Sequence, residues 1–302
     1  MAMTIGGLMP ILATPFCGDG DLDCESLRRL VEFELVSGVD GLAVFGMASE
    51  GFALTADERR TILREVTNVV AGQVPVIAGI NGTSTVGAIE QADEARSGGA
   101  DALMVLPPFM VKPPPGSLVE FYSEVAAATS LPIMVQDAPG VTGVTMSPEV
   151  IATLSRIDRV ESVKIESPPT APKVGAVVQA VNDNSFAVLG GQNSQFCLEE
   201  YARGAVGTMP ACEFPDLLQP VLALWRSGEE LSARNEFSRL LPLILLGLQP
   251  GIAWAVHKEV LVARGIIENS RVRYPASPMD GGTLTAIAAV LGALPIEIAA
   301  QV

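Results

Sequence analysis

The sequence predicts an α/β protein, a (β/α)8 TIM barrel with a C-terminal helical extension. Eight short apolar runs occur along the 302 residues, each followed by a helix-length stretch, at intervals of roughly 20–35 residues. Near-continuous apolar runs indicate strands buried on both faces, as in a parallel sheet. Three segments also resemble one another, each pairing a glycine-containing helix end with a β-prone run: SGVDGLAVFG (37–46), SGGADALMVLPP (97–108) and ARGAVGTMPA (202–211).

The remaining predicted strands are short apolar runs of the same kind: LMPILAT (8–14), PVIAGI (75–80), LPIMVQ (131–136), VESVKI (160–165) and FAVLGG (186–191). The clearest helical stretches carry apolar residues at i, i+3, i+4 and i+7, as in ADERRTILREVTNVV (56–70) and TVGAIEQADEARS (85–97). About two or three further helices follow the eighth unit. We therefore expect a barrel over residues 1–227 and a helical extension packed on it over residues 228–302.

Composition and charge exclude several classes of protein. Hydrophobic residues make up 49% of the chain and charged residues 18%, which suits a large folded core. The net charge of −15 disfavours binding to nucleic acid or to an anionic membrane surface. The most apolar segment (240–256) is interrupted by Gln249-Pro250-Gly251, which predicts two buried helices and no membrane span.

Cysteine and histidine usage indicates a cytoplasmic protein without a metal site. The four cysteines form no CxxC pair, and the apolar N-terminus lacks the basic region of a signal peptide, so we expect reduced thiols. His257 is the only histidine. This argues against a histidine-based zinc site and against a Ser-His-Asp triad that does not use His257.

Polar, glycine-rich motifs follow the predicted strands, and a lysine lies within one strand. Lys164 stands between Val163 and Ile165 and is one of only four lysines, so burial of its ammonium group calls for a functional reason. The carboxyl ends of barrel strands meet at one rim, where such motifs can form an active site. The motifs are GMASEG (46–51, hereafter the strand-2 loop), GINGTS (79–84), PPFM (107–110), QDAPG (136–140), KIES (164–167) and GGQNS (190–194).

The opening ILATPFCGDGDLD, the GMASE loop, VIAGINGTST and Lys164 resemble, in their order and spacing, the dihydrodipicolinate synthase / N-acetylneuraminate lyase family of class I aldolases and dehydratases, over nearly the whole chain. The resemblance implies that Lys164 forms a Schiff base with a small 2-keto acid. A buried lysine is a competent nucleophile, and its iminium acts as an electron sink, so no metal or diffusible cofactor is expected. The strand-2 loop would hold the substrate carboxylate at Ala48 and Ser49. A homotetramer is also implied.

Three positions depart from the family pattern. Most members end strand 5 in a proton-shuttling tyrosine, and here Gln136 stands instead; an amide can only orient a water or a hydroxyl. The arginine that clamps a second carboxylate in the synthases is replaced by Val141. The second tyrosine of their relay is replaced by Met110. These losses argue against dihydrodipicolinate synthesis and against sialic acid cleavage.

Glu166 is the predicted replacement for the tyrosine. It lies two residues after Lys164, so its side chain points to the same face if the strand continues. Together with Gln136, it makes the chain most similar to the 2-keto-3-deoxyarabonate dehydratase branch. The expected reaction is dehydration of L-2-keto-3-deoxyarabonate to 2-oxoglutarate semialdehyde. Phe109, Gly191 and Gln192 are further expected substrate-binding residues. Sugar length and stereochemistry should depend on loop residues such as Phe109, Gln192 and Asn193.

Other functions stay open at this point. An aldolase would cleave a 2-keto-4-hydroxy acid and release pyruvate. A deaminase acting on a cyclic imine derived from hydroxyproline would release ammonia. A non-catalytic keto-acid sensor would retain Lys164 for binding without turnover.

Overall fold

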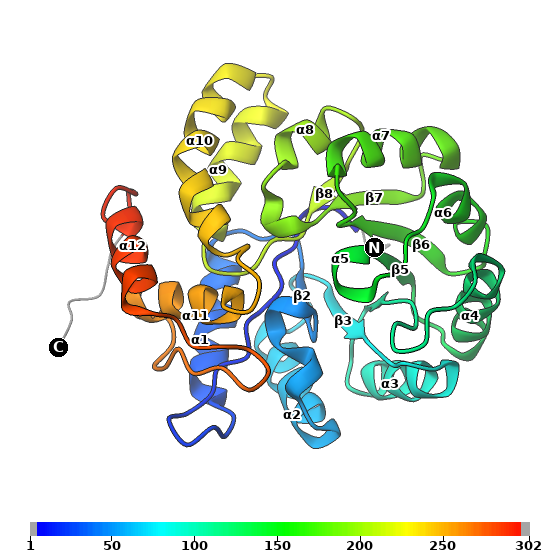
Figure 1. Cartoon of the computed structure of the whole chain (residues 1–302), viewed down its shortest axis with the longest axis horizontal. Coiled ribbons are helices and arrows are strands. Elements are labelled where there is room, and N and C mark those ends of the chain that lie inside the picture. Colours follow the sequence, from blue (N-terminus) through cyan, green and yellow to red (C-terminus); the bar gives the residue numbers. More distant parts are fainter. Residues whose placement is uncertain (1–4, 297–302) are drawn as a thin grey trace.

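The computed structural model describes residues 5–296, and its eight parallel strands form a closed barrel surrounded by helices (Figure 1). Strands consecutive in the chain are neighbours in the sheet. Ile11 closes the circle, because it bridges both Ala43 and Ala211. The strands are β1 (Gly7–Leu8), β2 (Leu42–Val44), β3 (Val76–Ile80), β4 (Ala102–Val105), β5 (Ile133–Asp137), β6 (Val160–Ile165), β7 (Ala187–Gly190) and β8 (Gly207–Thr208). The predicted fold class is confirmed.

The first strand is shorter than the predicted run 8–14, and the last is shorter than the β-prone part of the segment 202–211. Pro10 and Pro210 lack a backbone N–H and so interrupt a regular ladder. Their carbonyl groups still accept hydrogen bonds, from Ala43 N to Pro10 O at 2.9 Å and from Ile11 N to Pro210 O at 2.8 Å. Pairing therefore continues past the prolines as isolated bridges and closes the barrel.

The barrel helices begin where the local sequence caps them. Thr55 and Glu58 form a capping box at the start of α2, and the Ser84 side chain accepts from Gly87 N at the start of α3. Both helices have the predicted bounds. The helices up to β8 are α1 (Cys24–Val36), α2 (Ala56–Val70), α3 (Thr85–Ser97), α4 (Pro115–Ala128), α5 (Pro139–Thr142), α6 (Pro148–Leu154), α7 (Thr170–Val181) and α8 (Cys197–Tyr201).

In the part of the chain that the structure describes, four helices follow β8: α9 (Pro215–Arg226), α10 (Glu230–Leu246), α11 (Ala253–Ala263) and α12 (Gly281–Leu291). Gln249-Pro250-Gly251 separates α10 from α11, as the sequence predicted. No helix within residues 5–296 is long and apolar enough to cross a bilayer. Helix α10 packs along α9, whereas α11 contacts the 3₁₀ turn at Met47–Ser49 in the strand-2 loop (Figure 1). The division at residue 227 stays a prediction.

The barrel interior is filled by an apolar layer. Side chains alternate along a strand, so Met134 and Gln136 of β5 point inward together, as do Ser162 and Lys164 of β6. The apolar layer below Lys164 is almost inaccessible to solvent and consists of Met9, Ile11, Ala43, Ile77, Ala102, Met104, Met134, Leu189 and Met209. Apart from Ser162, the inward-facing side chains of β5 and β6 become polar only toward the carboxyl ends of the strands.

Candidate active site

Lys164 is buried inside the barrel, with only 4% of the residue exposed. Its strand places it between two neighbours, in register with Gln136 of β5 and Leu189 of β7. Its Nζ lies 3.3 Å from Oε1 of Glu166. The Glu166 carboxylate therefore offsets part of the free energy that burial of an ammonium group costs.

Glu166 contacts both of the other predicted catalytic residues. Its carboxylate accepts a hydrogen bond from Nε2 of Gln136 at 2.7 Å through Oε2, while Oε1 faces Lys164. Its backbone N–H donates to Asp137 O at 2.9 Å, so the β5–β6 pairing extends one residue past β6. This extension keeps Glu166 on the same face as Lys164, as period-two alternation predicted.

Gly191 lies against the lysine and the glutamate. A Cβ at this position would be 2.3 Å from Glu166 Cγ and 3.0 Å from Lys164 Cε. The side chains of Glu166 and Lys164 thus occupy the space that a side chain at position 191 would need. The next residue, Gln192, donates from Nε2 to the backbone oxygen of Glu166 at 2.9 Å. Both residues hold Glu166 in place, a contact that the sequence did not reveal.

The turn after β7 is held in an unusual conformation. Gln192, Asn193 and Ser194 have φ values of 51°, 52° and 62°, in the left-handed region that costs non-glycine residues free energy. The Asn193 side chain stabilises the turn, because its Oδ1 accepts from Ala211 N at 2.9 Å and its Nδ2 donates to Ile244 O at 3.2 Å. Strained turns of this kind cluster at functional sites.

The strand-2 loop carries a buried hydroxyl. Ser49 is 1% exposed, and its Oγ has no hydrogen-bond partner among the described residues. Its backbone is fixed, since Ser49 N donates to Gly46 O at 3.1 Å and its carbonyl accepts from Thr14 Oγ1 at 2.6 Å. Ala48 packs on the inner apolar layer. A buried hydroxyl without a protein partner is able to donate a hydrogen bond to a bound polar group.

The C-terminal helices hold the same loop from outside. Glu50 and Lys258 of α11, both fully buried, form an ion pair of 2.5 Å, and Glu50 also accepts from Arg273 N at 2.8 Å. Trp254 Nε1 donates to Met47 O at 2.6 Å. Burial lowers the pKa of Lys258 to about 8, although the nearby Glu50 carboxylate opposes the shift. Sequence reasoning missed this clamp; the available signal was a second lysine in an almost wholly apolar helix.

Other predicted positions lie further from these contacts. Phe109 is half-buried in the loop between β4 and α4, and no hydrogen bond, ion pair or aromatic contact within residues 5–296 joins it to Lys164, Gln136 or Glu166. Met110 and Val141 are exposed. Their side chains offer no polar group to a substrate.

The three tyrosines are engaged or exposed elsewhere. The Tyr122 hydroxyl donates to Val105 O at 2.9 Å from helix α4, and the Tyr201 hydroxyl donates to Gly7 O at 3.4 Å, by the amino end of β1. Tyr274 is 92% exposed. The groups assembled around Lys164 are therefore an amine, a carboxylate and an amide. This set can form an iminium and move a proton beside it.

Comparison with known proteins agrees with this geometry. Residues 4–294 match the dihydrodipicolinate synthetase family. L-2-keto-3-deoxyarabonate dehydratase of Azospirillum brasilense is 34% identical over 94% of this chain and 93% of its own length. A 4-hydroxy-tetrahydrodipicolinate synthase of Saccharophagus degradans is 32% identical over 91% of this chain and 93% of its length.

A solved structure shares the fold closely. Dihydrodipicolinate synthase from Rhodopseudomonas palustris superposes with a TM-score of 0.90 at 27% identity, covering 96% of this chain and 97% of that one. The family match spans almost all of the barrel and the helices that follow it. The chain is a Schiff-base lyase that belongs to the dihydrodipicolinate synthetase family.

Proposed function

We propose that this lyase dehydrates a short 2-keto-3-deoxy sugar acid, with L-2-keto-3-deoxyarabonate as substrate and 2-oxoglutarate semialdehyde as product. The observation that carries the proposal is the position of Glu166. One oxygen of its carboxylate faces Lys164 Nζ at 3.3 Å, and the other accepts from Gln136 at 2.7 Å. A base beside the iminium nitrogen lies close to the carbon that must lose a proton.

The reaction begins at Lys164. The unprotonated amine adds to the C2 carbonyl of the substrate and loses water to give an iminium. Glu166 then takes a proton from C3, and the electron pair of that C–H bond moves toward the iminium to form an enamine. No protein metal is needed for this step, because the iminium accepts the electrons.

Elimination follows from the enamine. The electron pair returns toward C3–C4 and expels the C4 hydroxyl, which leaves as water with the proton that Glu166 had gained. The Gln136 amide orients the carboxylate and the leaving group but exchanges no proton itself. Hydrolysis of the imine frees Lys164, and tautomerisation gives the semialdehyde. The net change is the loss of one water.

The strand-2 loop supplies the anchor for the substrate carboxylate in this proposal. Ser49 Oγ is buried without a partner among the described residues and can donate to a carboxylate oxygen. Ala48 contributes through its backbone. Gly191 and Gln192 border the reacting groups, and Phe109 stays a predicted contact for the distal end of the sugar acid.

Sequence identity alone does not choose between the two activities of the relatives, because 34% and 32% are nearly equal. The site favours the dehydratase. Among residues 5–296, the Tyr122 and Tyr201 hydroxyls donate to backbone oxygens elsewhere and Tyr274 is exposed, which argues against the relay that the synthase reaction uses. Val141 offers no cation for a second carboxylate. A cytoplasmic location and a homotetramer stay predictions.

The test combines covalent trapping with product analysis. Borohydride reduction in the presence of pyruvate, followed by peptide mass spectrometry, should modify Lys164. Lys164→Ala should abolish the adduct, and Lys112→Ala, which changes an exposed lysine in the loop after β4, should leave it unchanged. Without borohydride, L-2-keto-3-deoxyarabonate should yield the semialdehyde.

Other outcomes point to the other functions. Released pyruvate would indicate an aldolase, and ammonia from a hydroxyproline-derived cyclic imine would indicate a deaminase. An adduct on Lys164 without turnover of any of these compounds would favour a keto-acid sensor. Absence of an adduct on Lys164 would rule out the mechanism given above.

A further inference from the structure

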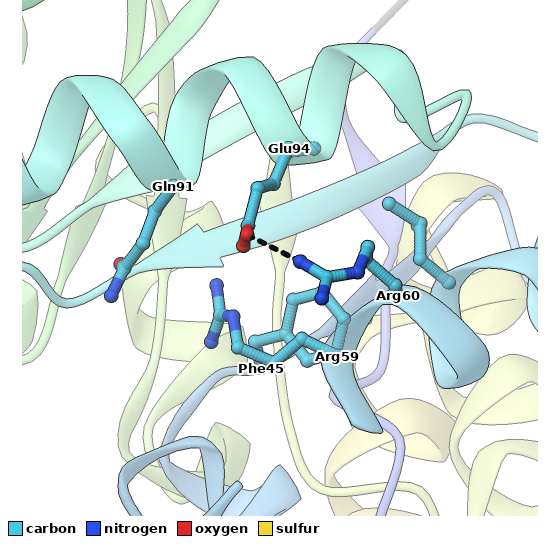
Figure 2. Close-up of a pocket in the computed structure, with 7 residues that line it drawn as sticks. Phe45, Arg59, Arg60, Gln91 and Glu94 are labelled. Carbon is cyan, nitrogen blue, oxygen red and sulfur yellow. Dashed lines mark hydrogen bonds and ion pairs between the residues drawn. The ribbon is translucent and has the colours of Figure 1, made fainter. Parts of the chain in front are cut away.

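A small cavity lies behind β2 and β3, between helices α2 and α3, away from the inside of the barrel (Figure 2). Two consecutive arginines of α2 border it and behave differently. Arg60 reaches outward to Glu94 of α3 at 2.8 Å and is half-exposed. Arg59 turns inward against Phe45, and only 6% of it is exposed.

Arg59 is buried without a carboxylate partner among the described residues. Burial lowers the pKa of its guanidinium to about 10. Its contacts are a ring and a carbonyl: Cζ lies 4.1 Å from the centre of the Phe45 ring, and Nη2 donates to Gly79 O at 2.8 Å. Burying a guanidinium costs free energy, and neither of these contacts neutralises its charge. This indicates that Arg59 has a structural role.

The two contacted residues meet at a strained turn. Phe45 follows β2 with φ of 61°, which is a genuine outlier for an aromatic residue. Its carbonyl oxygen lies 2.5 Å from where a Cβ of Gly79 would be and 2.4 Å from where a Cβ of Gly51 would be. Only glycine fits at either position. The Arg59 guanidinium contacts the Phe45 ring and donates to the Gly79 carbonyl oxygen, so it binds two of the residues that meet in this close approach.

The turn leads directly to the serine of the strand-2 loop. Gly46 O accepts from Ser49 N at 3.1 Å and from Gly51 N at 3.4 Å, so the position of Ser49 depends on the direction in which the chain leaves Phe45. From these contacts we infer that Arg59 is a positioning residue: it holds Phe45 in the left-handed conformation and thereby fixes Ser49 for carboxylate binding. The inference rests on the proposed role of Ser49.

The kinetics of two variants at Arg59 test this. Arg59→Met keeps an unbranched side chain that can still pack against Phe45, but it is shorter than arginine and removes the charge and the hydrogen bond. It should raise both KM for the sugar acid and the pyruvate concentration needed for half-maximal trapping by roughly tenfold or more, the equivalent of about 1.4 kcal/mol of binding. Turnover at saturation should change much less. Arg59→Lys, which keeps the cation, should fall between, and Arg60→Met should behave as wild type.

A double-mutant cycle separates positioning from a general effect on stability. If Arg59 acts through Ser49, Arg59→Met should add little to the defect of Ser49→Ala, because the group it positions is already absent. Independent effects that simply multiply would overturn the inference, as would a lowered Tm with unchanged half-saturation. Both results presuppose that wild type forms the adduct on Lys164. Failure of the wild type to do so would instead remove the proposed function, and this inference with it.

Discussion

Glu166 is held by three neighbours, and its charge state controls the proposed reaction. Replacement by glutamine keeps the shape and removes the base. Glu166→Gln should lower turnover by about 10²- to 10⁴-fold, which is the usual contribution of a general acid/base group. Trapping of pyruvate on Lys164 should persist. Steady-state kinetics and borohydride trapping measure the two effects separately.

Glu161 offers a matched control on the same strand. It lies on β6 and is exposed, so Glu161→Gln should leave both turnover and trapping unchanged. Equal losses in the two variants would show that the effect is not specific to the base. Loss of trapping together with turnover in Glu166→Gln would assign Glu166 to imine formation instead.

Glu200 of α8 is a buried carboxyl whose ionisation affects stability. Burial raises its pKa to about 7, and the charge of Glu166 adds to the shift. Between pH 4.5 and 7 the folded state keeps a proton that the unfolded state has lost, so the contribution of this group to stability falls as pH rises. The difference between the two pKa values corresponds to at most about 3 kcal/mol.

Glu200→Gln should therefore raise the Tm relative to wild type more at pH 8 than at pH 5. Thermal melts at both values measure the difference. The neighbouring Glu199→Gln, at a half-exposed surface position, serves as control and should shift the Tm about equally at both. A gain for Glu200→Gln that is the same at both pH values would contradict the pKa assigned to Glu200.

For individual residues, the alternation of side chains along a strand was enough to predict which catalytic candidates share a face. Lys164, Glu166 and Gln136 lie together because their strands are neighbours and their side chains share a face, which depends only on local period and strand order. Thr14 and Arg59 were missed, although both hold the strand-2 loop. Their contacts join positions 35 and 20 residues apart, and local pattern carries no information about such pairs.

Helix α11 is joined to the strand-2 loop by a buried ion pair, Lys258–Glu50, in addition to the Trp254 hydrogen bond. Lys258→Met should lower the free energy of unfolding by about 3–5 kcal/mol, because it leaves the Glu50 carboxylate buried without its cation. The double variant Glu50→Gln/Lys258→Met should recover much of that loss, since the buried charge is then gone. Denaturant unfolding of the single and double variants measures both.

Exposed Lys112 provides a control for loss of a lysine as such, and Lys112→Met should be close to neutral. If the double variant is no more stable than Lys258→Met, the cost does not arise from the unpaired carboxylate.

Two locally capped helices and strand β6 have the predicted bounds, whereas the first and last strands do not. Helices α2 and α3 have the expected bounds, because Thr55 and Ser84 stand at their N-caps. Strands β1 and β8 are shorter than their apolar runs, because Pro10 and Pro210 break the ladder. Both prolines are visible in the sequence, but a strand prediction based on hydrophobic pattern alone does not register the missing backbone N–H.

The whole molecule carries an excess of negative charge, 34 acidic against 19 basic residues. Self-repulsion of this kind destabilises a compact state and is screened by salt. The screening length falls from about 30 Å at 0.01 M to about 8 Å at 0.15 M. We expect the Tm to rise by about 2–4 °C over this range, equivalent to about 1 kcal/mol.

Melts at fixed protein concentration in NaCl and in KCl measure this, and the two salts should act alike because the effect is screening. A fall in Tm would mean that surface ion pairs such as Arg28–Glu65 outweigh the net repulsion.

The clamp on the strand-2 loop has a consequence for synthesis of the protein. Met47 and the Trp254 side chain that holds it are 207 residues apart in the chain. A ribosome adding about 5–20 residues per second takes on the order of 10–40 s to cover that distance. Throughout this interval the nascent loop lacks Trp254 and Lys258, although the early strands have already emerged. We therefore expect newly made chains to hold Ser49 in its final position only after α11 has been translated and has docked.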